Sequence, residues 1–233
     1  SVEQAPVVRG ETMRGKTLAV DTVLQGHYAI LRKLSEGGMG AVYLAQDTKL
    51  ARKVALKFLA AHLNSDDAYR ARFIREAQAA AQISHNNIVH IYNLVRDENG
   101  HFFIIMEYVD GITLSQKNKE GQLVLNDIIE YAIQVCEALQ AAHNKDIVHR
   151  DIKSDNIMVT YTNQIKVMDF GLAKMAGSVT QTKIRTTMGT LAYMSPEQMR
   201  GDPLDFRTDI WSLGIVLYEM ITRNLPFKGD YVQ

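Results

Sequence analysis

The chain has 233 residues, of which 46% are hydrophobic and 22% charged, a composition typical of a globular protein that buries a core. Lysine plus arginine number 26, as do aspartate plus glutamate, so no net charge favours binding to nucleic acid or a membrane surface. A single cysteine, Cys136, excludes an intramolecular disulfide and fits a reducing compartment. No apolar run is long enough to span a membrane, and no secretory signal opens the chain. We therefore expect a cytoplasmic protein, or the cytosolic part of a longer one.

The first predicted strands are joined by a glycine-rich connection. Residues 1–25 show no sustained periodicity and predict a flexible lead-in or an edge strand. Apolar residues alternate over residues 28–34 and again over 42–45, which predicts two strands. The glycines between them let the backbone approach a ligand closely and leave amides free for phosphate oxygens. A glycine-rich hairpin often binds nothing, and both interpretations stay open on these residues alone.

The next strand and helix carry opposite charges. Residues 54–58 predict a strand in which alternation puts Ala55 and Lys57 on one face. A small residue and a cation two positions apart suit an adenine ring over the first and phosphates at the second. Residues 67–83 predict a helix with an apolar face, and this helix carries Glu76. On position alone, Glu76 is either a partner for Lys57 or a surface charge balanced by an arginine one turn earlier.

Further elements follow outside the polar loops. Residues 88–95 and 102–107 predict strands. Asn126 predicts the N-cap of a helix whose apolar residues recur at helical spacing up to Leu139. Residues 208–222 predict a helix that is apolar nearly all round, and such a helix is expected to be buried.

The stretch VHRDIKSDNIMV, followed shortly by KVMDFG, holds the polar side chains around which the chain is organised. Two short strands within residues 157–168 would bring Asn156 and Asp169 to the same end of a hairpin. Their oxygens suit Mg²⁺ when phosphates complete the shell of the ion. Asp151 could then accept a proton from a hydroxyl beside that metal. Turn chemistry would explain a lone Asp or Asn here, but not the whole ordered set.

A long segment without periodicity, residues 172–193, follows this motif and is rich in threonine and basic residues. Such a run in a compact domain is usually a functional loop. A phosphate on one of its threonines could pair with a guanidinium, and Arg150, directly before Asp151, is the expected partner.

These motifs, in this order and at this spacing, resemble the eukaryotic-type (Hanks-type) Ser/Thr protein kinases. HRDIKSDN and DFG resemble the catalytic and metal-binding loops, VALK the strand with the nucleotide lysine, and Ser195-Pro196-Glu197 the motif APE. LSEGGMGAVYLAQD and SPEQMRG resemble the bacterial branch in particular. In the glycine-loop pattern GxGxxGxV, the first glycine is replaced by Ser35.

The resemblance implies an α+β, two-lobed protein-kinase-like fold. A small antiparallel β-sheet lobe with one helix would occupy residues 26–108, after the lead-in of residues 1–25. A larger, mainly helical lobe would occupy residues 109–233. Because family members continue past this point, we expect the C-terminal lobe to be truncated, or completed by a second copy. Glu197 would find its arginine partner in that further region.

The resemblance also assigns roles to individual residues. Transfer of the γ-phosphate of ATP would depend on Asp151 as the base, Lys153 beside the γ-phosphate and Lys57 on the α- and β-phosphates. Mg²⁺ would be held by Asn156 and Asp169. The remaining nucleotide-binding residues implied are Ser35, Gly37, Gly40, Val42, Ala55, Glu76, Met106, Glu107, Val109 and Met158.

The implied substrates are protein Ser and Thr hydroxyls. Thr180 and Thr182, in the stretch VTQT, are the main implied phosphorylation sites, with Thr186 and Thr187 as the alternative, and self-association would allow trans-autophosphorylation. We expect neither nucleic acid nor a membrane as a partner of this chain. Two rival functions stay open: a nucleotide-binding, pseudokinase-like scaffold with little catalysis, favoured by Ser35, and a kinase acting on a small molecule.

Overall fold

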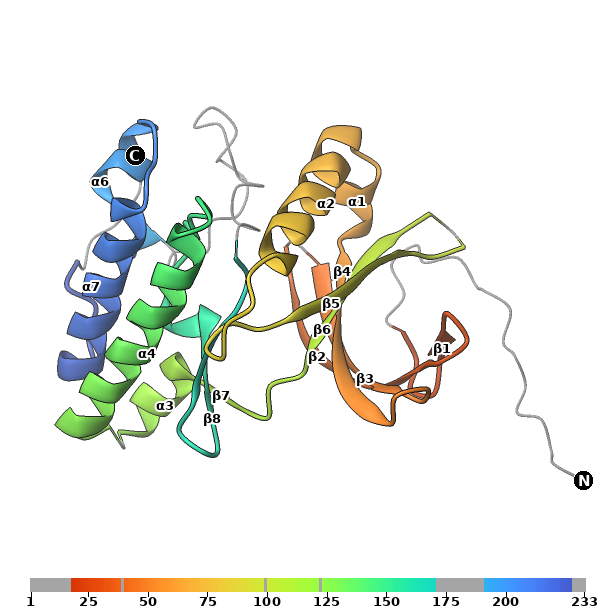
Figure 1. The fold of residues 1–233 in the computed structure, drawn as a ribbon, viewed down its shortest axis with the longest axis horizontal. Helices are drawn as coiled ribbons and strands as arrows, with labels where there is room; N and C mark the ends of the chain where they lie inside the picture. Colours follow the sequence, from red (N-terminus) through yellow and green to blue (C-terminus); the bar gives the residue numbers. More distant parts are fainter. Residues whose placement is uncertain (1–17, 39, 99, 122, 171–190, 228–233) are drawn as a thin grey trace, which may run out of the picture. The chain divides into compact units, whose positions relative to one another are not determined.

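The computed structural model describes residues 18–38, 40–98, 100–121, 123–170 and 191–227. The chain divides into two compact units, Ser1–Ala77 with Ile91–Tyr108 and Gln78–His90 with Val109–Gln233. A β-sheet dominates the first unit, and helices dominate the second (Figure 1).

A six-stranded antiparallel sheet is the framework of the first unit, with its strands in the order β1-β2-β3-β4-β6-β5 (Figure 1). Most predicted strands lie within the observed ones, and residues 102–107 coincide with β6. The bounds are β1 Val23–Leu24, β2 Tyr28–Gly37, β3 Gly40–Asp47, β4 Arg52–Leu59, β5 Ile91–Arg96 and β6 Phe102–Glu107.

The prediction of a strand from residue 88 is wrong by three residues, since β5 begins at Ile91. Ile88 instead forms a parallel bridge to Val167, and Val89 donates its N–H to the Val167 carbonyl at 3.0 Å. The apolar residues before Ile91 therefore serve a different sheet, in the second unit.

One face of the six-stranded sheet forms a hydrophobic core. Phe58 stacks on Phe103 with ring centroids 4.8 Å apart, and Tyr43 meets Phe58 edge-on at 5.7 Å. Every second residue of β4 packs into this core. Apolar residues therefore alternate along the strand, and this alternation is the pattern from which the strands were predicted. The buried residues of the cluster are Tyr28, Ile30, Tyr43, Ala45, Val54, Leu56, Phe58, Phe103 and Ile105.

Two helices follow β4. α1, Ala61–Asn64, is short, and α2 runs over Asp67–Ala81, close to the predicted 67–83. Phe73, Ala77 and Ala80 form the buried face of α2, which confirms the predicted apolar face.

The second unit combines helices with a three-stranded sheet in the order β7-β8-β9 (Figure 1). The predicted hairpin within residues 157–168 is confirmed by β8 and β9, which pair in antiparallel fashion. The bounds are β7 Gly111–Thr113, α3 Leu114–Glu120, α4 Leu125–His143, the 3₁₀ helix η1 Ser154–Asn156, β8 Ile157–Thr160, β9 Ile165–Val167, α6 Pro196–Arg200 and α7 Arg207–Thr222.

Two helix predictions require correction. α4 begins after Val124, which makes no side-chain cap bond, so the prediction of Asn126 as N-cap is wrong and that residue lies inside the first turn. α7 is buried on one face only: Val216 is fully buried, whereas Ile210 and Ile221 are 55% and 64% exposed. The expectation that α7 is buried all round is therefore wrong for the described residues.

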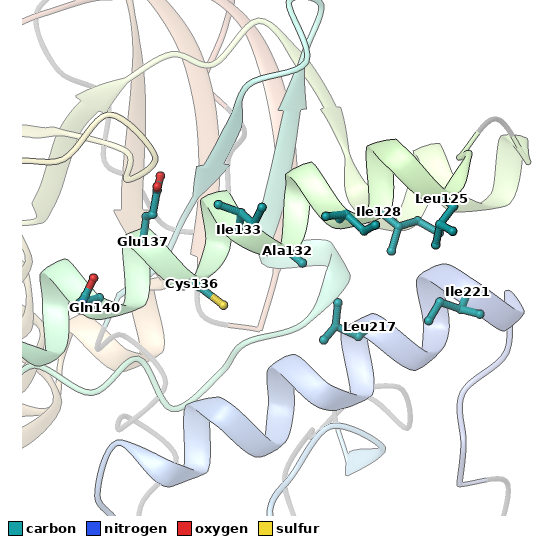
Figure 2. Close-up of a pocket in the computed structure, with 10 residues that line it drawn as sticks. Leu125, Ile128, Ala132, Ile133, Cys136, Glu137, Gln140, Leu217 and Ile221 are labelled. Atoms are coloured by element: carbon teal, nitrogen blue, oxygen red, sulfur yellow. The ribbon is translucent and has the colours of Figure 1, made fainter.

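An open apolar groove of about 620 Å³ lies between α4 and α7 (Figure 2). Leu217 and Ile221 of α7 point toward the apolar side chains of α4 across it. Cys136 also lines the groove and is exposed, although the periodicity of the sequence put it on the core face of α4. The α4 residues that line it are Leu125, Ile128, Ile129, Ala132, Ile133, Cys136, Glu137 and Gln140.

Candidate active site

The carboxylate of Asp151 is held by two donors from its own loop. Lys153 Nζ and Asn156 Nδ2 each donate to Asp151 Oδ2 at 2.8 Å. The Asp151 side chain keeps 21% of its surface exposed. Among the described residues, Oδ1 accepts no hydrogen bond, so one oxygen is anchored and the other can accept a proton from a ligand.

The β8–β9 hairpin brings the two predicted metal ligands to one end. Ile157 pairs with Val167, and Met168 donates its N–H to the Asn156 carbonyl at 2.9 Å. Asp169 follows directly and adopts a left-handed conformation with φ 63°. The chain therefore leaves β9 beside the end of η1, as the sequence predicted.

The amide of Asn156 has a defined orientation. Its Nδ2 donates to the Asp151 carbonyl and to Asp151 Oδ2, both at 2.8 Å, which leaves Oδ1 as an acceptor for a cation. In the part of the chain that the structure describes, no three His, Cys, Asp or Glu side chains gather into a metal site. A cation on Asn156 and Asp169 would thus complete its shell with water or phosphate, which is how Mg²⁺ binds in nucleotide sites.

A buried carboxylate from α7 holds the backbone before Asp151. Asp209 is fully buried and accepts the N–H of His149 at 2.8 Å and the N–H of Arg150 at 2.7 Å. His143 Nε2 donates to Asp209 Oδ2 at 2.8 Å. These bonds keep Arg150 in a left-handed conformation with φ 68°, which is costly for a residue with a side chain.

His149 connects this backbone to β9. The N–H of Asp151 donates to His149 Nδ1 at 3.2 Å, so the neutral ring carries its hydrogen on Nε2 and donates it to the Met168 carbonyl at 2.8 Å. The buried ring also meets Phe170 edge-on, with centroids 4.6 Å apart. Both chain segments that carry Asp151 and Asp169 are thereby fixed to one imidazole.

In the first unit, several predicted nucleotide-binding residues share one face of the sheet. The register pairs Val42 with Lys57 and Ala55 with Met106, and directly paired residues point to the same side. This face is opposite to the hydrophobic core formed by Val54, Leu56 and Phe58.

The two predicted loop glycines occupy different environments. A Cβ on Gly40, which has φ +142°, would lie 1.8 Å from the carbonyl oxygen of Phe58. The β3–β4 pairing therefore requires glycine at position 40 for steric reasons alone. A Cβ on Gly37 would meet nothing within 4 Å, so packing does not explain glycine there. Ser35 is exposed and pairs with Val42 across the hairpin.

The remaining predicted residues lie in both units. In the first, Glu76 is 9% exposed on α2, and Glu107 ends β6 opposite Val54. In the second, Val109 is 7% exposed, and Met158 is half-buried opposite Lys166 in the hairpin. Thr180 and Thr182 lie outside the described residues.

Two supporting residues were missed by the sequence reading. Gln198 forms a capping box with Ser195 at the start of α6 and also donates through Nε2 to the Arg150 carbonyl at 2.8 Å. The pattern S-x-x-Q could have indicated this cap. No sequence signal indicated the contact of His143 with Asp209, because the two residues are 66 positions apart.

A family model described as "Protein kinase domain" matches residues 28–233. The chain is 48% identical over 212 residues to a probable serine/threonine-protein kinase of Clostridium acetobutylicum, covering 91% of this chain and 32% of that protein. It is 45% identical over 215 residues to the serine/threonine-protein kinase PknB of Mycobacterium tuberculosis, covering 89% of this chain and 34% of PknB. The chain thus spans about a third of the length of these curated relatives.

Solved structures agree with this match. The kinase domain of PknI from Mycobacterium tuberculosis superposes with a TM-score of 0.74 at 28% identity, covering 94% of this chain and 82% of that domain. The predicted α+β, two-lobed kinase fold is confirmed by this likeness. In the described residues, no helix has the length and apolar character needed to cross a membrane.

Proposed function

We propose that this chain, which belongs to the protein kinase domain family, transfers the γ-phosphoryl group of ATP to Ser or Thr hydroxyls of protein substrates. The observation that carries the proposal is the Asp151 carboxylate, anchored through Oδ2 by Lys153 and Asn156. Its Oδ1 takes the proton of the attacking hydroxyl. Such positioning, together with charge neutralisation, supplies most of the catalysis in phosphoryl transfer.

Mg²⁺ fits the donor set at the end of the hairpin. Nδ2 of Asn156 makes the hydrogen bonds to Asp151, which leaves Oδ1 for a cation, and Asp169 lies two residues after the end of β9. Mg²⁺ held there by Asn156 and Asp169 would neutralise negative charge on the phosphates. Lys153, which donates to Asp151 Oδ2, offsets negative charge on the γ-phosphate.

The nucleotide is bound by the first unit through the sheet face that carries Val42, Ala55, Lys57 and Met106. Lys57 holds the α- and β-phosphates and is supported by Glu76. The amides near Gly37 and Gly40 cover the phosphates, and the open space around Gly37 supports that assignment. Glu107 of the first unit, and Val109 and Met158 of the second, are further adenine contacts that the resemblance to the kinase family implies.

Autophosphorylation of Thr180 and Thr182 activates the enzyme, and a second copy of the chain delivers the phosphate in trans. Arg150 is the receiver of that phosphate. Its Nε is buried and has no hydrogen-bond partner among the described residues, which supports this role because a guanidinium N–H without an acceptor gains much from a phosphate. Mass mapping after incubation with ATP and Mg²⁺ tests it: modification confined to other residues would contradict it.

The proposed function is tested by Lys57→Met and Asp151→Asn, assayed with labelled ATP, Mg²⁺ and a generic basic protein. We expect each variant to lose about 10³-fold or more in kcat/KM, because each removes a group that acts in the transition state. Lys53→Met, an exposed lysine on the same strand, and Asp155→Asn, an exposed aspartate in the same loop, are matched controls and should retain activity. Wild-type turnover in Lys57→Met or Asp151→Asn would contradict the assignment.

The same assay separates the rival functions. A pseudokinase-like scaffold would bind ATP without labelling any protein. A small-molecule kinase would label neither itself nor the basic protein, but would turn over ATP when a metabolite is added.

A further inference from the structure

Three oxygen-bearing side chains from distant segments meet beneath the catalytic loop. The Tyr193 hydroxyl donates to Glu219 Oε2 at 2.6 Å, and Ser154 Oγ donates to Glu219 Oε1 at 3.2 Å. The Ser154 and Tyr193 oxygens lie 3.0 Å apart. Ser154 is 1% exposed and Tyr193 is 6% exposed. We call this set the Ser154–Tyr193–Glu219 cluster.

Both hydroxyl hydrogens of this cluster are donated to the Glu219 carboxylate. Each hydroxyl has a single hydrogen, and each has a carboxylate oxygen of Glu219 within reach, so both oxygens of the carboxylate accept. Burial, and then the hydrogen bond to Glu219, raise the pKa of Tyr193 above its ordinary value, so the phenol keeps its proton and acts as a donor at neutral pH. Hydrogen bonds to a charged acceptor are the stronger kind, and removing one partner leaves a buried polar atom unsatisfied.

The cluster is anchored on α7, the helix that also carries Asp209. Ser212 of α7 donates to the Tyr193 carbonyl at 2.9 Å, and the Glu219 carbonyl accepts from Asn118 at 2.9 Å. α7 thus holds the catalytic loop at two places: Asp209 binds the backbone before Asp151, and Glu219 binds the residue after Lys153.

We propose that Tyr193 and Glu219 are positioning residues that act through Ser154. The three residues Asp151, Ile152 and Lys153 lie between the two attachment points on α7. His149, Asn156 and Gln198 also bond to this loop, and the attachment of Ser154 to Glu219 adds a fixed point directly after Lys153. Without that fixed point, the backbone of Lys153 can move and the Lys153–Asp151 contact loses its single geometry. Displacements of about 1 Å in such a group can reduce turnover about a hundredfold. The predicted loss of turnover rests on the proposed kinase function, whereas the predicted loosening of the loop does not.

The test compares Tyr193→Phe, Ser154→Ala and the double variant with wild type and with Tyr218→Phe. Tyr218 is the matched control, because it lies next to Glu219 in α7 but is 45% exposed. We expect Tyr193→Phe to reduce kcat about tenfold and Ser154→Ala several-fold, with the KM for ATP within about twofold of wild type. Because the two hydroxyls share one carboxylate, the double variant should be little worse than Tyr193→Phe alone.

Several results would overturn the proposal. One is a wild-type kcat in Tyr193→Phe. Another is a fold-loss of kcat in the double variant that equals the product of the losses in the two single variants. A third is a loss of kcat that is fully explained by the fraction of protein found unfolded in thermal melts. Glu219→Gln provides a second variant in case Ser154→Ala does not fold, and it should match Tyr193→Phe.

Amide hydrogen exchange across residues 150–156 adds a readout that needs no turnover. We expect faster exchange there in Tyr193→Phe than in Tyr218→Phe, and equal rates would overturn the proposal. An inactive wild-type chain with this exchange difference would contradict the proposed function while supporting the positioning role.

Discussion

The carboxylate of Asp209 accepts the backbone N–H of His149 at 2.8 Å, although the two residues are 60 positions apart in the chain. The same carboxylate binds the N–H of Arg150 and the imidazole of His143, so three donors converge on one fully buried acid. A buried charge is tolerated only when it is paired or fully hydrogen-bonded, and Asp209 meets this condition. The helix α7 therefore fixes the backbone directly before Asp151, the proposed catalytic base.

Asp209→Asn should lower both stability and turnover. The substituted amide turns one acceptor into a donor that faces N–H groups, so at least one charged hydrogen bond is lost and one donor is left unsatisfied. We expect the free energy of unfolding to fall by about 2–4 kcal/mol, measured by urea denaturation, and kcat to fall with it. Asp205→Asn is the control, because its partner Arg207 is exposed and the loss of that pair should change stability little. Equal stability of the two variants would contradict the role given to Asp209.

The two loop glycines should respond differently to alanine. Gly40→Ala places a Cβ 1.8 Å from the Phe58 carbonyl oxygen at a φ of +142°, so the β3–β4 pairing must distort. We expect a loss of about 2–4 kcal/mol, seen as a lower melting temperature without nucleotide. Gly37→Ala has open space around the new methyl group and should leave the melting temperature nearly unchanged. A similar loss in both variants would show that the steric argument is wrong.

Periodic elements were predictable because their signal is local. Val54, Leu56 and Phe58 alternate with Ala55 and Lys57, and the observed register puts the two sets on opposite faces. The β8–β9 hairpin was predictable for the same reason, since two apolar runs flank a polar turn. The burial of α7 was not predictable, because an apolar composition does not tell which of its faces other elements cover.

Contacts between distant segments were beyond reach of the sequence alone. Nothing in the sequence around Ser154 indicates that its hydroxyl binds Glu219, which is 65 positions away. The sequence thus predicts which residues carry the chemistry, but it does not indicate the hydrogen bonds that hold them.

Asn87→Ala should destabilise the hairpin that carries the proposed metal ligands. The buried side-chain amide of Asn87 donates to the Ile165 carbonyl at 2.9 Å and to Gln134 Oε1 at 2.8 Å, and the backbone carbonyl of Asn87 accepts from the N–H of Val167 at 2.8 Å. We expect a loss of about 1–3 kcal/mol, because two acceptors lose their donor. Asn86→Ala changes the same residue type at an exposed neighbouring position and should have little effect in the same urea titration. If Asn87→Ala lost no more free energy of unfolding than Asn86→Ala, the Asn87 side-chain contacts would contribute nothing to stability.

The stability of the protein should fall at alkaline pH because of the buried phenol of Tyr131. The side chain is fully buried and donates to Asn163 Oδ1 at 3.0 Å. Burial, with smaller contributions from Asp127 and Glu130, raises the pKa of Tyr131 from its ordinary value of 10.0 to about 12. Above pH 10 the unfolded chain releases this proton while the folded chain still keeps it, so stability falls as the pH rises toward 12.

Tyr131→Phe removes this titration, so its free energy of unfolding should decrease less steeply between pH 9 and 11 than that of wild type, measured by urea denaturation at each pH. Tyr193 and Tyr28 also have raised pKa values and remain in both proteins, so only the difference between the two slopes reports on Tyr131. Tyr161→Phe, at a position 78% exposed in the β8–β9 turn, should reproduce the wild-type slope. If Tyr131→Phe also keeps the wild-type slope, the Tyr131 phenol ionises in the folded protein as readily as in water, and its burial does not protect it.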